Sequence, residues 1–316
     1  MTNRTSRLAP SPTGALHLGN ARTFLINWAL ARQEGWRLLM RIEDLDGPRV
    51  KPESTCQTLD ILAWLGLDWD GDPTVQSTDL DPYRDAMRQL SRRRLVFPCD
   101  LSRKEIEQAA SAPHTGEHEL RFPPGLRPTH IGENEFTDEA RSYRFLVPDE
   151  VIRIDDAFSG PVEFNPHFEV GDFVIWTKRG VPAYQLAVVV DDARQGVTEI
   201  VRGEDLLASA ARQGLLYRAL ELEAPRYCHL PLVLGPDGRR LAKRHGDTRL
   251  ITYREAGVAP QRIIGLLAFW CGLAEQPEEM TATDFRDRFE LATLSGDPVI
   301  FSETDHAWLL GRHSSS

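Results

Sequence analysis

A histidine and a glycine end a loop rich in proline and glycine, in the sequence RLAPSPTGALHLGN of residues 7–20. A strand is predicted before this loop and a helix after it, so the loop delivers His17 and Gly19 to the first turn of the helix. The free N–H groups and the positive dipole end of a helix N-terminus attract phosphate. Gly19 allows a ligand to approach the backbone closely, and the His17 imidazole can hydrogen-bond to phosphate oxygens. The segment therefore predicts a phosphate site, and a capped helix with an incidental histidine is the alternative.

A second segment, LGPDGRRLAKRH at residues 234–245, combines a turn with several positive charges around Lys243. Cations held close together repel one another unless an anion neutralises them, and a triphosphate would do so. A solvated run of charges is the alternative. The chain contains neither G-x-x-x-x-G-K-[ST] nor G-x-G-x-x-G, so a bound nucleotide would depend on His17 and Lys243 instead. That hypothesis requires the two segments to meet in space.

The elements around the first segment predict a parallel α/β sheet. Residues 4–9 are predicted to form a strand, and a helix begins at Leu18 and ends at Gly35. Residues 36–44, WRLLMRIED, alternate between apolar and polar positions as a second strand does. A strand, a helix and a strand in succession form a crossover unit, which is almost always right-handed. This is the start of a doubly wound, Rossmann-like sheet.

The second half of that sheet is predicted further along the chain. Residues 183–192, AYQLAVVVDD, form a continuous apolar run, which is typical of a strand covered on both faces. Residues 197–202 are predicted to be another strand, and residues 203–213 a helix. Residues 98–130 are rich in proline, histidine, glycine and charge, which favours an insertion away from the sheet.

These elements predict four parts of the chain. The fold class is α/β, a doubly wound parallel sheet with an inserted α/β module and a helical C-terminal part. The predicted parts are 1–95, the first half of the catalytic domain; 96–180, the inserted module; 181–250, the second half; and 251–316, the helical C-terminal region.

Composition narrows the class of protein. The chain has 316 residues, 41% of them apolar and 27% charged, with a net charge of −10. This acidity argues against non-specific coating of nucleic acid, although a local basic strip could still contact RNA. Four cysteines stand far apart with no C-x-x-C pair, and no apolar run is long enough to span a membrane. The expectation is a reduced, cytoplasmic protein.

Four segments carry a resemblance to a known family. RLAPSPTGALHLGNART at 7–23 resembles the HIGH region of glutamyl-tRNA synthetases, and RRLAKR at 239–244 resembles their KMSKS loop, with Ala242 in place of a serine. RIEDLDGPR at 41–49 and PAYQLAVVVDDARQGVTEIVRGEDLL at 182–207 are similar to the two halves of their amino-acid site. The segments occur in the same order as in that family, a group of class I aminoacyl-tRNA synthetases.

Within the family the chain most resembles a short paralogue group, the glutamyl-queuosine tRNA(Asp) synthetases. Only about 70 residues follow Lys243, which leaves no room there for the anticodon-binding region of the longer enzymes. The resemblance implies ATP-dependent activation of L-glutamate and its transfer to queuosine in tRNA(Asp) by a monomer. The alternatives are a catalytic fragment charging tRNA(Glu), a nucleotidyltransferase acting on a small molecule, and a non-catalytic relic.

The resemblance also implies residue roles. A zwitterion with two carboxylates needs two cations and one anion, which Arg7, Arg202 and Glu43 supply. Which arginine takes the side-chain carboxylate stays open, and a structural ion pair is the alternative for each. The implied glutamate-binding residues are Arg7, Ala9, Ser11, Glu43, Tyr184 and Arg202; the ATP-binding residues are His17, Gly19, Asn20 and Lys243, with His17 and Lys243 catalytic and Mg²⁺ sharing the phosphate charge.

A zinc site is the point at which the resemblance weakens. Many relatives carry C-x-C followed by Y-x-x-x-C in the insertion, whereas here Cys99 remains and Leu101 stands in the second place. Cys99, His114 and His118 are suitable ligand types, with Asp100 as a fourth. A loop that has lost its zinc is favoured, so no metal ligand is predicted.

Overall fold

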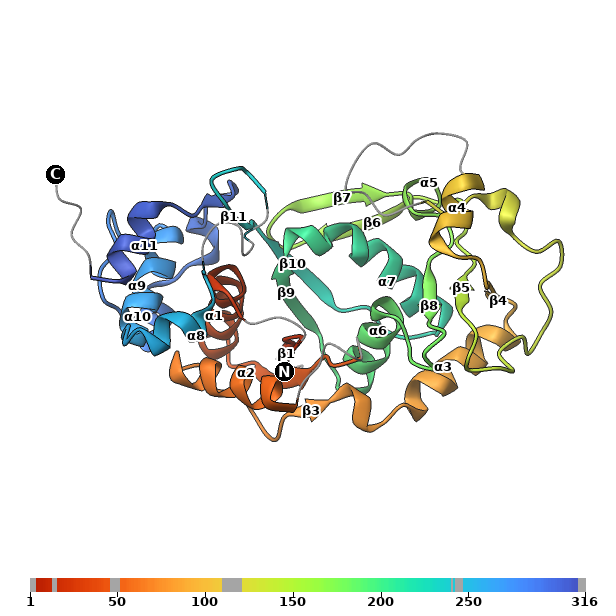
Figure 1. The fold of residues 1–316 in the computed structure, drawn as a ribbon, viewed down its shortest axis with the longest axis horizontal. Helices are drawn as coiled ribbons and strands as arrows, with labels where there is room; N and C mark the ends of the chain where they lie inside the picture. The colour runs from red at the N-terminus through yellow and green to blue at the C-terminus, as the bar shows by residue number, and fades with distance from the viewer. Residues whose placement is uncertain are drawn as a thin grey trace.

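A parallel sheet forms the centre of the molecule (Figure 1). The structure is a computed structural model. Its described residues are 4–12, 16–45, 52–109, 121–239, 241 and 247–311. Strands pair in parallel as β1 with β2, β2 with β3, and β9 with β10. The bounds of these strands are Thr5–Leu8 for β1, Arg37–Ile42 for β2, Thr74–Val75 for β3, Glu199–Gly203 for β9 and Arg226–Leu230 for β10.

The two halves of the sheet meet at β1 and β9. The Thr198 N–H donates to the Thr5 carbonyl over 2.9 Å, and the Thr5 N–H donates to the Thr198 hydroxyl over 3.0 Å. The order across the layer is therefore β3-β2-β1-β9-β10. The chain order reverses between β1 and β9, and ligands of doubly wound sheets bind at the carboxyl ends of the strands beside such a reversal.

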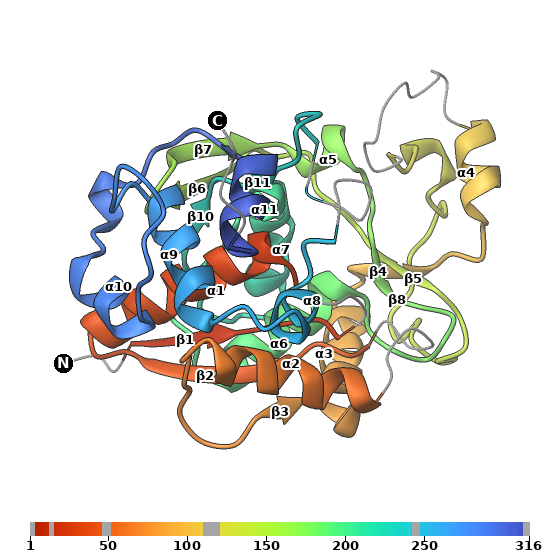
Figure 2. The same ribbon diagram turned by 60° about the vertical axis from the view of Figure 1, so that its left-hand side comes forward.

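Helix α1 (Leu18–Gln33) confirms the first predicted crossover unit. Leu18, Ala21 and Leu25 are fully buried, because this face packs against β1 and β9. The helix ends before Gly35, whose φ of 65° is in the left-handed region that favours glycine. Its other side packs against the C-terminal helices α9 and α10, as Figure 2 shows.

The prediction of a strand at residues 183–192 is wrong, because α6 (Tyr184–Arg194) is a helix. All eight side chains from Gln185 to Asp192 are buried, so the helix has no polar face to give the sequence a helical period. A buried run of valines cannot be assigned to helix or strand by periodicity alone. The predictions of strand β9 and of helix α7 (Leu207–Ala219), entered through a 3₁₀ turn at Glu204–Leu206, are confirmed.

The segment between α3 and α6 adds strands at one end of the molecule and a hairpin that reaches back over its centre (Figure 1). Strands β4, β5 and β8 form an antiparallel sheet, and β6 and β7 form a hairpin that lies beside β10. The domain boundaries stay a prediction. The bounds are Pro52–Trp64 for α2, Asp81–Arg92 for α3, Val96–Pro98 for β4, Arg103–Ala109 for α4, Tyr143–Phe145 for β5, Ile152–Asp156 for β6, Gly160–Phe164 for β7, Pro166–Glu169 for α5 and Val174–Trp176 for β8.

The C-terminal part is mostly helical and packs against α1. Its buried residues belong to the same apolar core as β1, β2 and α1, so it is part of the body that holds the sheet.

Among the described residues, every helix is too short or too polar to span a membrane. The bounds are Val233–Leu234 for β11, Leu250–Glu255 for α8, Pro260–Trp270 for α9, Ala282–Arg288 for α10, Val299–Ile300 for β12 and Glu303–Leu309 for α11.

Candidate functional site

The carboxyl ends of three neighbouring strands carry the charged residues predicted from the sequence. Arg7 lies near the end of β1, Glu43 directly follows β2, and Arg202 is the penultimate residue of β9. Tyr184 begins α6 and is 40% exposed. Desolvation of its phenol by the surrounding residues raises the pKa of Tyr184; Glu43 adds to that shift, and Arg202 and Arg7 oppose it. The structure therefore brings these side chains to one edge of the sheet.

Two further predicted residues lie in the segment that leaves β1. Ala9 and Ser11 flank Pro10, whose carbonyl accepts a 3.0 Å hydrogen bond from the Glu43 N–H. This bond ties the exit of β1 to the exit of β2. The backbone around Ala9 and Ser11 is thereby held beside Glu43.

Arg7 and Glu43 belong to a buried cluster of ion pairs that also contains Arg41 and Asp192. The Asp192 Oδ1 accepts from the Arg7 Nε at 3.1 Å and from an Arg41 terminal nitrogen at 2.7 Å. Arg41 also donates to the Glu43 Oε1 through its Nε at 3.3 Å and its other terminal nitrogen at 3.1 Å. Burial alone would raise the pKa of Asp192, but Arg41 and Arg7 outweigh it and lower that pKa. Asp192 is therefore held as a carboxylate between two guanidinium groups.

Asp191, the neighbour of Asp192 on α6, faces the other side of Arg41. Its Oδ2 accepts from the Gln76 Nε2 and from the Tyr83 hydroxyl, each at 2.8 Å, and lies 4.0 Å from the Arg41 Nε. Burial raises the pKa of Asp191, although Arg41 opposes that shift. Of the two carboxylates at the end of α6, Asp192 is therefore the hydrogen-bond partner of Arg41, and Asp191 acts on it only electrostatically.

Arg202 has a different environment. Its Nε donates to the His229 Nε2 at 3.0 Å, and one terminal nitrogen donates to the Leu206 carbonyl at 3.2 Å. The His229 Nδ1 lies 2.6 Å from the Asp156 Oδ2. Because the Nε2 accepts a hydrogen bond, the proton of the neutral imidazole is on Nδ1. Within the described ranges Arg202 has no carboxylate partner, and its remaining terminal nitrogen is buried without a hydrogen bond.

Burial lowers the pKa of His229, with Arg202 adding to the effect and Asp156 opposing it. The ring is fully buried and stacks on Tyr227 at a centroid distance of 5.6 Å. An imidazolium would point an N–H at the Arg202 Nε–H. The neutral form is therefore the one that holds Arg202 in place.

His17 caps helix α1. Its Nδ1 accepts from the backbone N–H groups of Gly19 at 3.2 Å and Asn20 at 3.4 Å, and the Asn20 side chain accepts from the His17 N–H at 3.3 Å. In this structure the His17 ring accepts from the N–H groups of Gly19 and Asn20, and the roles of His17, Gly19 and Asn20 in binding ATP stay a prediction. A Cβ at Gly19 would lie 3.1 Å from the ring, so the glycine makes room for the imidazole.

Lys243 lies outside the described residues, but both flanks of its segment lie against α1. A Cβ on Gly19 would lie 3.6 Å from the Val233 Cβ on β11, which precedes the segment. After it, the Leu18 N–H donates to the Thr248 carbonyl at 3.2 Å, and the Leu250 N–H donates to the Leu16 carbonyl at 2.9 Å. The described residues before and after Lys243 therefore both lie against the start of α1.

The zinc prediction concerns residues that the structure describes only in part. Cys99 is 8% exposed and packs with Phe97, Ile106 and Phe122. The Asp100 carboxylate pairs with Arg141. His114 and His118 lie outside the described residues. Among the described ones, no group of three or more metal-ligating side chains is present, and the loss of zinc stays a prediction.

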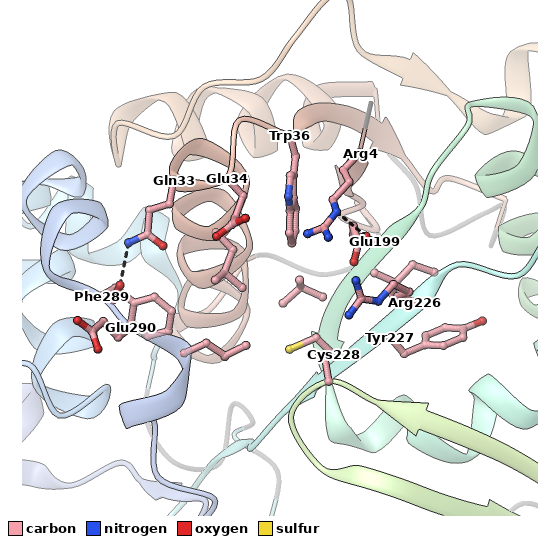
Figure 3. Close-up of a pocket in the computed structure, with 15 residues that line it drawn as sticks. Arg4, Gln33, Glu34, Trp36, Glu199, Arg226, Tyr227, Cys228, Phe289 and Glu290 are labelled. Atoms are coloured by element: carbon pink, nitrogen blue, oxygen red, sulfur yellow. Dashed lines mark hydrogen bonds and ion pairs between the residues drawn. The ribbon is translucent and has the colours of Figure 1, made fainter. Parts of the chain in front are cut away.

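A cavity of about 610 Å³ lies away from these residues (Figure 3). Its lining includes Trp36 and the starts of β9 and β10, which puts it at the amino ends of the strands. Arg4 on its wall already pairs with Glu199 at 3.6 Å. Carboxylates and guanidinium groups both line it, so the lining favours no class of charged ligand. The site at the carboxyl ends is the one that gathers the predicted residues.

Sequence reasoning missed Arg41, Asp192 and His229. Arg41 lies two residues before the motif residue Glu43. Side chains two residues apart in a strand are on the same face, so both lie on one face of β2 and its extension. Asp192 ends an apolar run, where a carboxylate signals a buried charge that needs a partner. Nothing in the sequence around His229 connects it to Arg202.

Comparisons with known proteins agree with this geometry. A glutamyl-Q tRNA(Asp) synthetase of Symbiobacterium thermophilum is 46% identical over 93% of this chain and 94% of its own. A glutamate–tRNA ligase of Nitratidesulfovibrio vulgaris is 38% identical over 99% of this chain and 67% of its own.

The fold is similar to solved structures as well. A glutamate tRNA ligase from Elizabethkingia meningosepticum, in complex with its amino acid, superposes with a TM-score of 0.80 at 28% identity, covering 97% of this chain and 68% of that one. Residues 4–308 match the family described as tRNA synthetases class I (E and Q), catalytic domain. The chain therefore belongs to the glutamyl and glutaminyl group of class I tRNA synthetases, a family of ATP-using ligases.

Proposed function

We propose that this chain activates L-glutamate with ATP to glutamyl-adenylate and transfers the glutamate to queuosine at the wobble position of tRNA(Asp). The single observation that carries the proposal is the gathering of Arg7, Arg202 and Glu43 at the carboxyl ends of adjacent strands. Two cations and one anion match a zwitterion with two carboxylates. The names of relatives similar over nearly their whole length support the acceptor.

Arg202 is the stronger candidate for an anionic group of the substrate. The residue is 5% exposed, and within the described ranges its guanidinium has no carboxylate partner. A buried cation without a counter-charge is costly, and a substrate carboxylate would relieve that cost. Arg7 shares its charge with Asp192, so it contributes less uncompensated charge. Tyr184 would form a wall of the pocket, and Ala9 and Ser11 would contribute backbone and hydroxyl groups.

ATP would bind beside the start of α1. His17 accepts at Nδ1, so its neutral ring carries the proton on Nε2 and presents a donor suited to a phosphate oxygen. Lys243, on the segment that begins and ends at α1, would neutralise the triphosphate. Mg²⁺ keeps several of its waters and is commonly bound through substrate phosphates in nucleotide sites. When bound, Mg²⁺ would share the phosphate charge.

The activation step needs positioning more than covalent chemistry. The glutamate α-carboxylate attacks the α-phosphorus in line, the bond to pyrophosphate breaks, and an acyl-adenylate forms. The fixed guanidinium of Arg202 and the carboxylate of Glu43 would orient the amino acid, while His17 and Lys243 stabilise the charge on the phosphates. A hydroxyl of the queuosine cyclopentenediol would then attack the acyl carbon and release AMP. A monomer suffices for both steps.

The proposal is tested in two assays. Glutamate-dependent pyrophosphate exchange is measured without tRNA, and transfer of labelled glutamate is measured to tRNA(Asp) with and without queuosine. Exchange together with queuosine-dependent labelling is expected. Labelling of tRNA(Glu) alone would identify a charging enzyme instead. Exchange that needs no glutamate would indicate a nucleotidyltransferase, and no exchange at all a non-catalytic relic.

The same assay tests the role of Lys243. Lys243→Ala is expected to lower the exchange rate about a hundredfold, the scale of losing one stabilising donor to the transition state. Arg239→Ala, in the turn of the same segment, is the matched control and is expected to stay within about threefold. Equal effects of the two variants would favour a solvated charge run.

A further inference from the structure

Arg41 is fully surrounded by groups that accept its hydrogen bonds. Its side chain is 1% exposed. The Nε and one terminal nitrogen reach the Glu43 Oε1, and the other terminal nitrogen reaches the Asp192 Oδ1 at 2.7 Å and the Gln195 Oε1 at 2.9 Å. A planar guanidinium can satisfy all these acceptors at once, whereas an ammonium on a flexible chain cannot match this fixed fork.

Asp192 links this arrangement to Arg7. One oxygen, Oδ1, accepts from both Arg7 and Arg41, and its carboxylate is completely buried. The positions of Arg7 and Glu43 therefore depend on the same Arg41–Asp192 pair. Displacement of Arg41 would release Glu43 directly and would loosen Arg7 through Asp192.

The charge of Glu43 depends on the same pair. Its side chain is 13% exposed. Burial raises the pKa of Glu43 above its ordinary value, Arg41 and then Arg7 oppose that shift, and Asp192 adds to it. Tyr184, at the start of α6, lies close enough to Glu43 for the two groups to interact electrostatically. An ammonium group binds to the carboxylate and not to the carboxylic acid. Arg41 is therefore the main group that keeps Glu43 in the form a substrate amine requires.

We infer that Arg41, held by Asp192, is the positioning residue of the amino-acid site: it fixes the Glu43 carboxylate and, through Asp192, the Arg7 guanidinium. Arg41 touches no substrate in this scheme. The inference rests on the proposed function, because it takes Glu43 and Arg7 as ligands of the amino acid. A purely structural ion pair would affect only the stability of the protein. This inference predicts in addition that a change at Arg41 raises the KM for glutamate.

A second arginine–aspartate ion pair, Arg127 with Asp172 in the segment between α3 and α6, serves as a control for Arg41 and Asp192. Arg127 donates to both oxygens of Asp172, at 2.7 and 2.8 Å, and the Asp172 carboxylate is fully buried. The other hydrogen-bond partners of Arg127 are the Val147 carbonyl and His167, so none of its partners belongs to the amino-acid site. Arginine-to-lysine substitution at the two sites removes the same fork geometry and keeps the charge.

The test compares Arg41→Lys with Arg127→Lys in pyrophosphate exchange, with glutamate varied at saturating ATP and then ATP varied at saturating glutamate. For Arg41→Lys the KM for glutamate is expected to rise tenfold or more, about 1.4 kcal/mol, while the KM for ATP changes less than twofold. The acidic limb of the kcat/KM profile for glutamate is expected to move to higher pH, because Glu43 loses the two hydrogen bonds that lower its pKa. Arg127→Lys is expected to lower the thermal midpoint and leave both KM values and the pH profile unchanged.

A milder variant covers the case in which Arg41→Lys does not fold. Gln195→Met removes one acceptor of Arg41 and is expected to raise the KM for glutamate two- to threefold, again without affecting ATP. Unchanged glutamate KM and pH profile in both variants, with the wild type active, would overturn the inference and leave the proposed function intact. A wild type whose exchange does not require glutamate would overturn both.

Discussion

The two sides of the candidate amino-acid pocket hold their arginines by opposite means. On the β1–β2 side, Arg7 and Arg41 are surrounded by Asp192, Asp191 and Glu43, so two guanidinium groups face three carboxylates. On the β9–β10 side, Arg202 is held by a neutral imidazole and a backbone carbonyl. On the first side the carboxylates balance both guanidinium charges without a ligand, with one carboxylate in excess. The second keeps its positive charge available for a ligand.

This contrast separates stability from binding. A buried pair is strongly destabilised when one partner is removed, because the other charge is left alone. Loss of a buried charge that has no counter-ion costs much less for the fold, yet it removes the attraction for an anion. The β1–β2 side is therefore expected to dominate folding, and the β9–β10 side to dominate affinity for a carboxylate.

The largest expected effect is on folding. Arg41→Met leaves Asp192 and Glu43 without their shared cation, and the free energy of unfolding is expected to fall by about 3–5 kcal/mol. Arg202→Met is expected to cost less than about 1 kcal/mol. Urea unfolding of both variants at neutral pH measures the difference. Equal losses in the two variants would contradict the comparison.

The next effect is on glutamate. Arg202→Met is expected to lower kcat/KM for glutamate a hundredfold or more, because losing one partner of a desolvated charge pair costs about 2–5 kcal/mol. The KM for ATP is expected to stay near that of the wild type. Pyrophosphate exchange at varied glutamate concentration measures this. A variant that loses affinity for ATP and glutamate alike would place Arg202 in a structural role.

A smaller effect is expected from pH, through His229. Asp156, Arg202 and Tyr227 face its ring, and burial lowers its pKa below the ordinary value of about 6.5. The unfolded chain then binds a proton that the folded chain does not, so stability falls as pH drops from about 6.5 through the lowered pKa. The slope is at most about 1.4 kcal/mol per pH unit.

The control for that prediction is His229→Asn, which has no proton to bind in this range. The free energy of unfolding, measured from pH 7.5 to 5, is expected to depend less on pH in the variant than in the wild type. Identical pH dependence in the two proteins would show that His229 does not titrate differently in the folded state.

The sequence predicted the first crossover unit and β9, because their apolar periods and the glycine at the end of α1 are local signals. It failed at α6, where every side chain from Gln185 to Asp192 is buried and the helical period disappears. It also failed to find Asp192 as the partner of Arg7, because a contact across 185 residues depends on how α6 packs. The gathering of Arg7, Glu43 and Arg202 was predictable only through the resemblance to a family.

The smallest expected effect concerns a buried hydroxyl between the two sides. Tyr217 on α7 is 1% exposed, and its hydroxyl has no hydrogen-bond partner among the described residues. Burial raises the pKa of this phenol, and Asp192 adds to the shift. Tyr217→Phe removes an unpaired polar group at nearly constant shape, so the free energy of unfolding is expected to rise by up to about 1 kcal/mol. Asp192 keeps both its arginine partners in that variant, and glutamate-dependent exchange should be unchanged. A loss of stability would instead show that the hydroxyl supports the Asp192 side of the pocket.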